Sequence, residues 1–311
     1  MERRGLNIRK VLLGTILPLL RKLPPRVASN MVAGIGRTEY ALLRGVRHRV
    51  DTAVSYGQHH FGKDWDVTRV GRELAGNQIR WRTRDRLLDG LSDEQVNPLF
   101  QVDGREHLND ALAEKRGVLL LCNHFGSHMM PAHWLYRAGY PLRLFMERPR
   151  HISKFLSSQF DSEGSTGQKK LFISRKANPT EAAGSIMRAA RVLNAGMVLM
   201  IAGDVRWSGP QNSPAEFLGR RYTFSNTWIK LASMSGAAVV RVFCRIEDDG
   251  SFTLEFHPPY HIPKGDHDPE AAANLVQDFL RAVEREVERY PANSNEYFFW
   301  NELEAEAATS A

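Results

Sequence analysis

The sequence predicts an α/β fold: a mixed, mostly parallel sheet covered by helices, with a helical region before it. From residue 101 onward, short apolar runs alternate with longer segments that show helical spacing. Residues 1–100 show apolar residues at helical spacing, punctuated by Gly and Pro. A chain of 311 residues with 42% hydrophobic residues can bury a sizeable core. We therefore expect a helical region at 1–100, an α/β core at 101–300 and a frayed tail at 301–311.

The expected strands are short apolar runs bounded by residues that favour turns. The clearest is Val118–Cys122, which lies between Gly117 and Asn123. The other runs of this kind are Leu142–Met146, Val198–Ala202, Ala237–Arg245 and Phe252–Phe256. The last two runs are separated by a turn sequence, Asp248-Asp249-Gly250, which predicts a hairpin.

The expected helices combine apolar residues at helical spacing with Gly or Pro near their ends. They are Arg26–Arg47, Asp51–His60, Met130–Ala138, Pro179–Ala195, Ser225–Ser235 and a last long helix from Pro269 to just before Pro291. The segment 203–221 is rich in polar residues, and we expect it to be a loop.

His124 is the first candidate for chemistry. It follows the expected strand Val118–Cys122, and ligands of open α/β sheets bind beyond the carboxyl ends of the strands. An imidazole there titrates near neutral pH and can accept a proton from a hydroxyl or amine. Asn123 and Ser127 flank it in the sequence and are candidate substrate contacts. The alternative is a core histidine whose nitrogens bind backbone groups.

Asp204 follows the expected strand Val198–Ala202. If that strand lies beside Val118–Cys122, both carboxyl ends share one edge, and Asp204 can orient the His124 imidazole and stabilise its charged form. The alternative is an aspartate that forms a turn. Glu147 and Arg148 follow Leu142–Met146 and are expected at the same edge, where Arg148 could bind phosphate or carboxylate. A surface ion pair is the alternative for both.

The net charge of +7 is unevenly distributed. Residues 1–50 hold eleven Lys or Arg and two Glu, a formal charge of +9, so the remaining residues carry −2. With the apolar run Val11–Leu20, this region predicts a helix at the surface of an anionic membrane; the alternative is a core-packing helix with a solvated basic face. The run is too short to span a bilayer and lacks a signal-peptide cleavage site. Confinement of the positive charge to one end disfavours nucleic-acid binding.

A family resemblance rests on the order of several motifs. The stretch GREHLNDALAEKRGVLLLCNHFGSH, residues 104–128, resembles the first half of the bacterial lipid A biosynthesis acyltransferases, the lauroyl/myristoyl branch of the lysophospholipid acyltransferase superfamily. MVLMIAGD at Met197–Asp204 resembles the second core strand of that family and its aspartate. Further pieces extend the resemblance over residues 23–300.

The resemblance implies a glycerolipid acyltransferase-like fold and an acyltransferase activity. The acyl donor would be an acyl carrier protein or CoA thioester. The acceptor would be a hydroxyl or amine of a lipid A-like glycolipid or of a specialised metabolite. His124 would act as the general base. No metal or other cofactor is implied, and the spacing of His124, His128 and His133 does not by itself predict zinc. We expect a cytoplasmic protein, peripheral on the inner face of the cytoplasmic membrane.

One position departs from the signature of the family. That signature is His-x-x-x-x-Asp/Glu, a histidine and an acid separated by four residues. Met129 occupies the acidic position after His124, and a thioether cannot replace a carboxylate as partner of an imidazole N–H. His128 stands where the family usually has an aromatic residue, and we expect it to line the substrate site. The alternative reading is a catalytically impaired family member that binds lipid or a partner protein.

Overall fold

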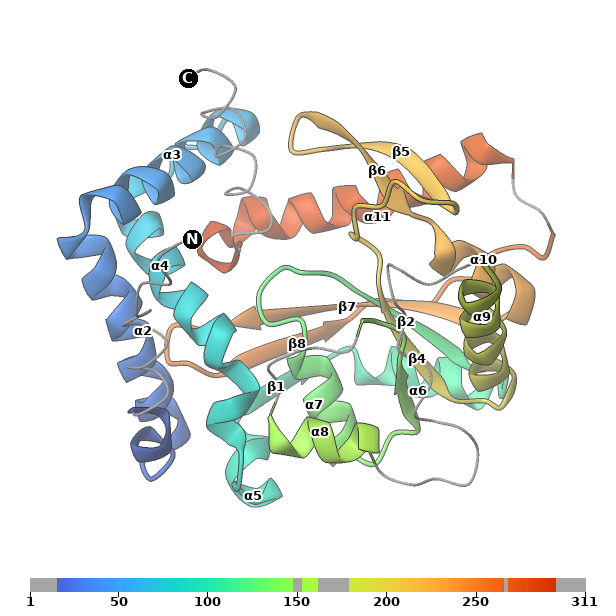
Figure 1. Ribbon diagram of the computed structural model, residues 1–311, viewed down its shortest axis with the longest axis horizontal. Helices are drawn as coiled ribbons and strands as arrows, with labels where there is room; N and C mark the ends of the chain where they lie inside the picture. Colours follow the sequence, from blue (N-terminus) through green and yellow to red (C-terminus); the bar gives the residue numbers. More distant parts are fainter. Residues whose placement is uncertain (1–15, 148–152, 162–178, 266–267, 295–311) are drawn as a thin grey trace, which may run out of the picture.

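The computed structural model describes residues 16–147, 153–161, 179–265 and 268–294 (Figure 1). Its larger helices are α2 (Pro25–Leu42), α3 (Arg44–Phe61), α4 (Val67–Thr83), α6 (Arg105–Ala113), α7 (Met130–Arg137), α8 (Lys154–Asp161), α9 (Pro179–Asn194), α10 (Thr227–Ser235) and α11 (Pro269–Arg289). Short helical turns are η1 (Arg84–Leu88), α5 (Asp93–Val96), η2 (Asn97–Leu99) and η4 (Pro291–Asn293). The strands are β1 (Phe100–Asp103), β2 (Val118–Cys122), β3 (Leu142–Leu144), β4 (Val198–Ala202), β5 (Asn212–Phe217), β6 (Arg220–Ser225), β7 (Ala238–Ile246) and β8 (Phe252–Phe256).

Six strands form the central sheet in the order β1-β8-β7-β2-β4-β3. Every neighbouring pair is parallel except β7 and β8, which form the antiparallel hairpin that the turn sequence predicts. The sheet is therefore mixed and mostly parallel, as predicted. β2 lies at its middle, between β7 and β4.

Helices cover both faces of this sheet, so its central strands are apolar on both sides. Leu119 and Leu121 of β2 pack in one core cluster with residues of α9, α10 and α11. Leu120 and Cys122 point to the other face and pack in a second cluster with residues of α6 and α7. In Figure 1, α11 and α7 accordingly lie on opposite sides of the sheet. Because both faces of β2 are buried, Val118–Cys122 is an unbroken run of apolar residues.

The N-terminal helices α2, α3 and α4 pack together at one end of the sheet (Figure 1). α2 approaches α4 so closely that a Cβ at Gly36 would overlap the Ala75 carbonyl oxygen. Buried Arg80 of α4 donates hydrogen bonds to Ser29 of α2 at 3.3 Å and to the carbonyls of Glu247 and Asp248 at 3.2 and 3.0 Å. Arg80 therefore ties the helical region to the β7–β8 turn.

The boundaries of the first helices differ from the prediction. The chain bends at Leu43, which adopts an extended conformation between α2 and α3, whereas the expected helix ran through this residue to Arg47. No proline or glycine occupies position 43, so local sequence does not mark the bend. β3 is also shorter than the expected strand and ends at Leu144.

The expectation of a polar loop at 203–221 was wrong over its second half. β5 and β6 form an antiparallel hairpin whose two-residue turn, Leu218-Gly219, has positive φ at both positions. Alternate residues of β5 are buried, but two of the outward positions in between are Pro214 and Glu216, which disfavour a strand prediction. The hairpin packs on α11, where Gln277 exchanges two hydrogen bonds with the backbone of Glu216 at 2.8 and 2.9 Å.

None of the helices within the described ranges is long and apolar enough to cross a bilayer. The expected tail at 301–311 and the first half of the run Val11–Leu20, residues 11–15, lie outside those ranges. Of that run, Leu17 and Leu20 are buried against α2, while Leu19 is 63% exposed.

Candidate functional site

The site is built where the two central strands β2 and β4 end. These strands are parallel and in register, with Cys122 beside Ala202. The Gly203 amide donates to the Cys122 carbonyl at 2.9 Å, so the hydrogen bonding between the two segments extends one residue beyond β4. Parallel pairing therefore brings His124 and Asp204 to the same edge of the sheet, as the sequence predicts.

His124 and Asp204 are in direct contact. Oδ1 of Asp204 lies 2.8 Å from Nδ1 of His124, and Oδ2 accepts a hydrogen bond from the His124 backbone N–H at 2.7 Å. Asp204 is fully buried, while the His124 side chain is 24% exposed. A carboxylate in this position makes Nδ1 the protonated nitrogen of a neutral imidazole, so Nε2 carries the lone pair. The arrangement suits an imidazole that accepts a proton.

The loop after β2 is held by backbone contacts. Gly126 adopts φ of 58°, and a Cβ there would overlap the Cys244 carbonyl oxygen. Its amide donates to the Asn293 carbonyl at 2.9 Å, and the Ser127 amide donates to the Cys244 carbonyl at 3.0 Å. Gly126 is therefore required both for its conformation and for its small size.

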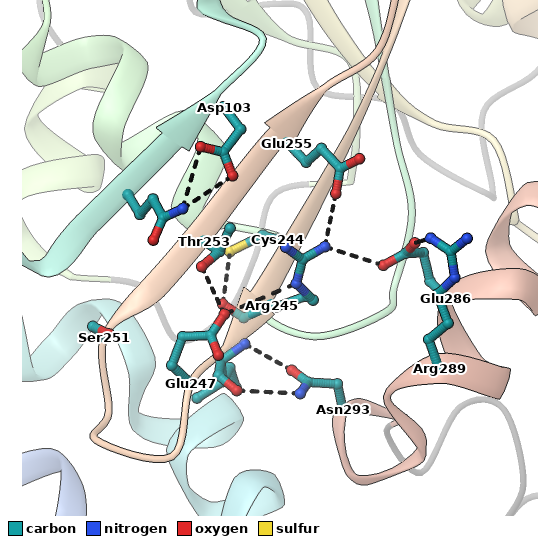
Figure 2. A network of polar contacts seen from close by, with 12 residues as sticks. Asp103, Cys244, Arg245, Glu247, Ser251, Thr253, Glu255, Glu286, Arg289 and Asn293 are labelled. Atoms are coloured by element: carbon teal, nitrogen blue, oxygen red, sulfur yellow. Dashed lines mark hydrogen bonds and ion pairs between the residues drawn. The ribbon is translucent and has the colours of Figure 1, made fainter.

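Asn293 connects this loop to the sheet. Its side chain accepts from the Ile246 amide at 2.7 Å and donates to the Ile246 carbonyl at 3.1 Å, as Figure 2 shows. Nearby in the same view, Arg245 contacts Glu255 and Glu286, which links β7 to β8 and α11. Asn293 follows α11 far along the sequence, and no sequence pattern pointed to it.

Asn123 and Ser127 are both buried beside His124. Both ends of the Asn123 amide bind backbone groups: Oδ1 accepts from the Phe125 N–H at 3.0 Å, and Nδ2 donates to the Val242 carbonyl at 3.3 Å. Asn123 thus shapes the loop. The Ser127 hydroxyl has no hydrogen-bond partner among the described residues. A role of either residue in substrate binding stays a prediction.

His128 and Met129 lie on different sides of the loop. The ring of His128 lies 4.9 Å from that of His124, centre to centre, and its Nδ1 accepts a hydrogen bond from Nε1 of Trp81 at 3.2 Å. Met129 is buried in the cluster formed with α6 and α7. Trp81 belongs to α4, and sequence reasoning missed it because its contact with His128 depends on how the N-terminal helices pack.

Glu147 and Arg148 follow β3, which pairs with the outer side of β4. Glu147 is exposed. Arg148 lies outside the described residues, so its expected position at the strand edge stays a prediction.

Three other side chains near the site have shifted pKa values. Burial raises the pKa of the Cys122 and Cys244 thiols, so both cysteines are protonated at neutral pH. Burial, with a smaller contribution from the Arg137 guanidinium, lowers the pKa of His133 to about 3. His133 is therefore neutral at physiological pH, and it packs against Phe155 rather than against His124.

Comparisons with known proteins place the chain in a family. A comparison with curated proteins gave no match. Among solved structures, the 1-acyl-sn-glycerophosphate (LPA) acyltransferase PlsC from Thermotoga maritima aligns with 14% identity and a TM-score of 0.39, over 86% of this chain and 98% of that chain. The family model described as bacterial lipid A biosynthesis acyltransferase matches residues 6–298. Because this match spans nearly the whole chain, the protein belongs to the bacterial lipid A biosynthesis acyltransferase family and is an acyltransferase.

Proposed function

We propose that this acyltransferase moves an acyl group from an acyl carrier protein or CoA thioester to a hydroxyl or amine, with His124 as general base. The observation that carries the proposal is the 2.8 Å contact between His124 Nδ1 and the buried Asp204 carboxylate. This contact supplies the partner that Met129 cannot provide. Asp204 orients the ring and stabilises the imidazolium that forms when Nε2 takes a proton.

The reaction then proceeds in two proton transfers. His124 Nε2 accepts the proton of the acceptor hydroxyl or amine as its oxygen or nitrogen bonds to the thioester carbonyl carbon. The tetrahedral intermediate collapses, the carbon–sulfur bond breaks, and the leaving thiolate takes the proton back from His124. Arg148 would bind the phosphate or carboxylate of a substrate, as the resemblance to the family implies.

The acceptor would be a lipid A-like glycolipid or a specialised metabolite. The experiment supplies purified protein with lauroyl, myristoyl and palmitoyl thioesters of CoA and of acyl carrier protein, and with a panel of glycolipid and amine acceptors. Mass spectrometry then identifies acylated products. We expect one donor–acceptor pair to give product, and His124→Ala to lower turnover at least about a hundredfold while the thermal unfolding curve is unchanged. Equal turnover by the two proteins would contradict the proposal.

Met129 favours one alternative, a family member that binds acyl lipid or a partner without turnover. The same panel separates the two readings. Binding of an acyl thioester without any acylated product, in wild type and His124→Ala alike, would support the alternative.

We also propose that the protein works at the cytoplasmic face of an anionic membrane. Support comes from four exposed apolar residues that recur every four positions: Leu19, Leu23, Val27 and Met31. We call these residues the apolar row. Val27 and Met31 lie on one face of α2, which forms an outer edge of the molecule in Figure 1. Exposed Lys22 and Arg26 lie within the same segment and suit anionic headgroups.

A further inference from the structure

The hydrogen bond between Trp81 and His128 determines which nitrogen of His128 carries a proton. An indole N–H can only donate, so His128 Nδ1, 3.2 Å from Trp81 Nε1, must accept. The neutral ring therefore carries its proton on Nε2. Protonation of Nδ1 would break this hydrogen bond and bring two N–H groups together.

This arrangement places a donor beside the proposed base. The rings of His124 and His128 are neighbours, with centres 4.9 Å apart and planes inclined by 45°. The N–H and lone-pair directions of the two imidazole nitrogens diverge widely, so the Nε2–H of His128 is directed away from Trp81. His124 is set by Asp204 to accept a proton at Nε2, and His128 is set by Trp81 to donate a hydrogen bond at Nε2.

The two histidines therefore suit the two needs of acyl transfer, which are a base for the nucleophile and a donor for the carbonyl oxygen. A general base must lie within hydrogen-bond reach of the attacking atom, so the attacked carbon lies close to His124. The ring of His128 is a neighbour of the His124 ring, so it is the candidate donor to the oxygen on that carbon.

We propose that His128 is a second catalytic histidine, held by Trp81 as the Nε2–H tautomer, that donates a hydrogen bond to the oxyanion of the tetrahedral intermediate. This inference rests on the proposed function of His124. As the nucleophile bonds to the carbonyl carbon, the carbonyl π electrons move to oxygen, and His128 stabilises that negative charge without transferring its proton. When the carbon–sulfur bond breaks, the carbonyl re-forms and the hydrogen bond weakens.

The backbone around His128 is suited to a fixed donor. The Ser127 amide binds the Cys244 carbonyl, and the Met130 amide binds the Ser127 carbonyl at 2.9 Å, so residues on both sides of His128 are anchored. A donor that is already oriented before the reaction stabilises the developing charge without reorganisation. Loss of one such donor costs about a hundredfold to a thousandfold in turnover in other acyl-transfer enzymes.

The first test is independent of activity. Nitrogen-15 NMR of the full chain at neutral pH reports the tautomer of each histidine, with His128→Gln used to assign the His128 signals. We expect His128 to be protonated at Nε2 alone, and Trp81→Phe, which keeps an aromatic ring but removes the N–H, to produce a mixture of tautomers. Protonation of His128 at Nδ1 in the wild-type chain would overturn the proposal.

The second test compares replacements of His128 in turnover of the acyl thioester. His128→Phe retains a ring without a donor, and we expect kcat to fall about a hundredfold with KM little changed. His128→Gln carries an N–H near the position of Nε2 and should recover part of this loss, whereas His128→Asn carries its N–H near Nδ1 and should not. Exposed His48, replaced in His48→Phe, is the matched control, and thermal unfolding checks each fold.

The outcomes distinguish this inference from the proposed function. If His124→Ala is inactive while His128→Phe retains the wild-type kcat, His124 remains the base and the role of His128 is wrong. If His124→Ala retains wild-type turnover, the proposed function itself fails. Equal kcat for His128→Gln and His128→Asn would also contradict a donor at Nε2.

Discussion

Asp204 contacts His124 at two points, with one carboxylate oxygen 2.8 Å from the ring nitrogen Nδ1 and the other 2.7 Å from the backbone nitrogen. The same acid therefore positions both the ring and the chain that bears it. In the signature of the family the acid follows the histidine in the sequence, whereas the carboxylate that contacts His124 comes from Asp204, just beyond the neighbouring strand β4. The in-register pairing of β2 with β4 makes this substitution geometrically possible.

Met129 cannot simply be exchanged for the acid of the family signature. Its side chain is 1% exposed and packs among the apolar residues between the sheet and α7. We expect Met129→Glu to lower the free energy of unfolding by about 3 kcal/mol, because a carboxyl group would be buried there. Met129→Leu is the matched control and should cost less than about 1.5 kcal/mol. Equal stability of both variants by urea denaturation would contradict this description of the core.

Gly126 provides a test of the loop that carries His124. Gly126→Ala would place a methyl group against the Cys244 carbonyl, so the loop must move. We expect turnover to fall about a hundredfold, because the loop carries the proposed base His124 and small displacements of such a group are costly. Gly139→Ala is the control: Gly139 also has positive φ, 77°, but a Cβ there meets no atom within 4 Å. If Gly139→Ala lowers turnover more than Gly126→Ala does, this account of the loop is refuted.

His133 makes stability depend on pH. Because burial lowers its pKa to about 3 from an ordinary 6.5, the unfolded chain binds a proton below pH 6.5 that the folded chain does not. Stability is therefore lost as the pH falls. Between pH 7 and pH 5, wild type should lose about 2 kcal/mol more than His133→Phe. Parallel pH profiles of unfolding free energy for the two proteins would contradict a buried, neutral His133.

The apolar row predicts membrane binding that salt weakens. Full-length protein should sediment with anionic vesicles at low ionic strength and be released as salt screens the Lys and Arg charges. The triple variant Leu23→Ser, Val27→Ser, Met31→Ser should bind less. Met187→Ser, which removes an exposed methionine of α9, should bind like wild type. Sedimentation of the triple variant to the wild-type extent would exclude this surface.

The sequence predicted the centre of the sheet well because β2 and β4 are short unbroken apolar runs that end at Asn123 and Gly203. Their carboxyl ends could be located for the same reason, which is why His124 and Asp204 were expected together. The β5–β6 hairpin was missed because Pro214 and Glu216 obscure its alternation. The Trp81–His128 contact could not be predicted, since it depends on how α4 packs at the edge of the sheet.

The most direct test of the central claim is a double-mutant comparison of turnover. Asp204→Asn keeps the shape of the side chain but removes the charge that holds the His124 imidazole. Because a carboxylate that orients a catalytic histidine can contribute about four orders of magnitude in rate, we expect Asp204→Asn to approach the defect of His124→Ala. Because the two residues act as one unit, the double variant should be hardly slower than either single variant. Wild-type turnover by Asp204→Asn, or defects that multiply in the double variant, would contradict the pairing of His124 with Asp204 as the catalytic base.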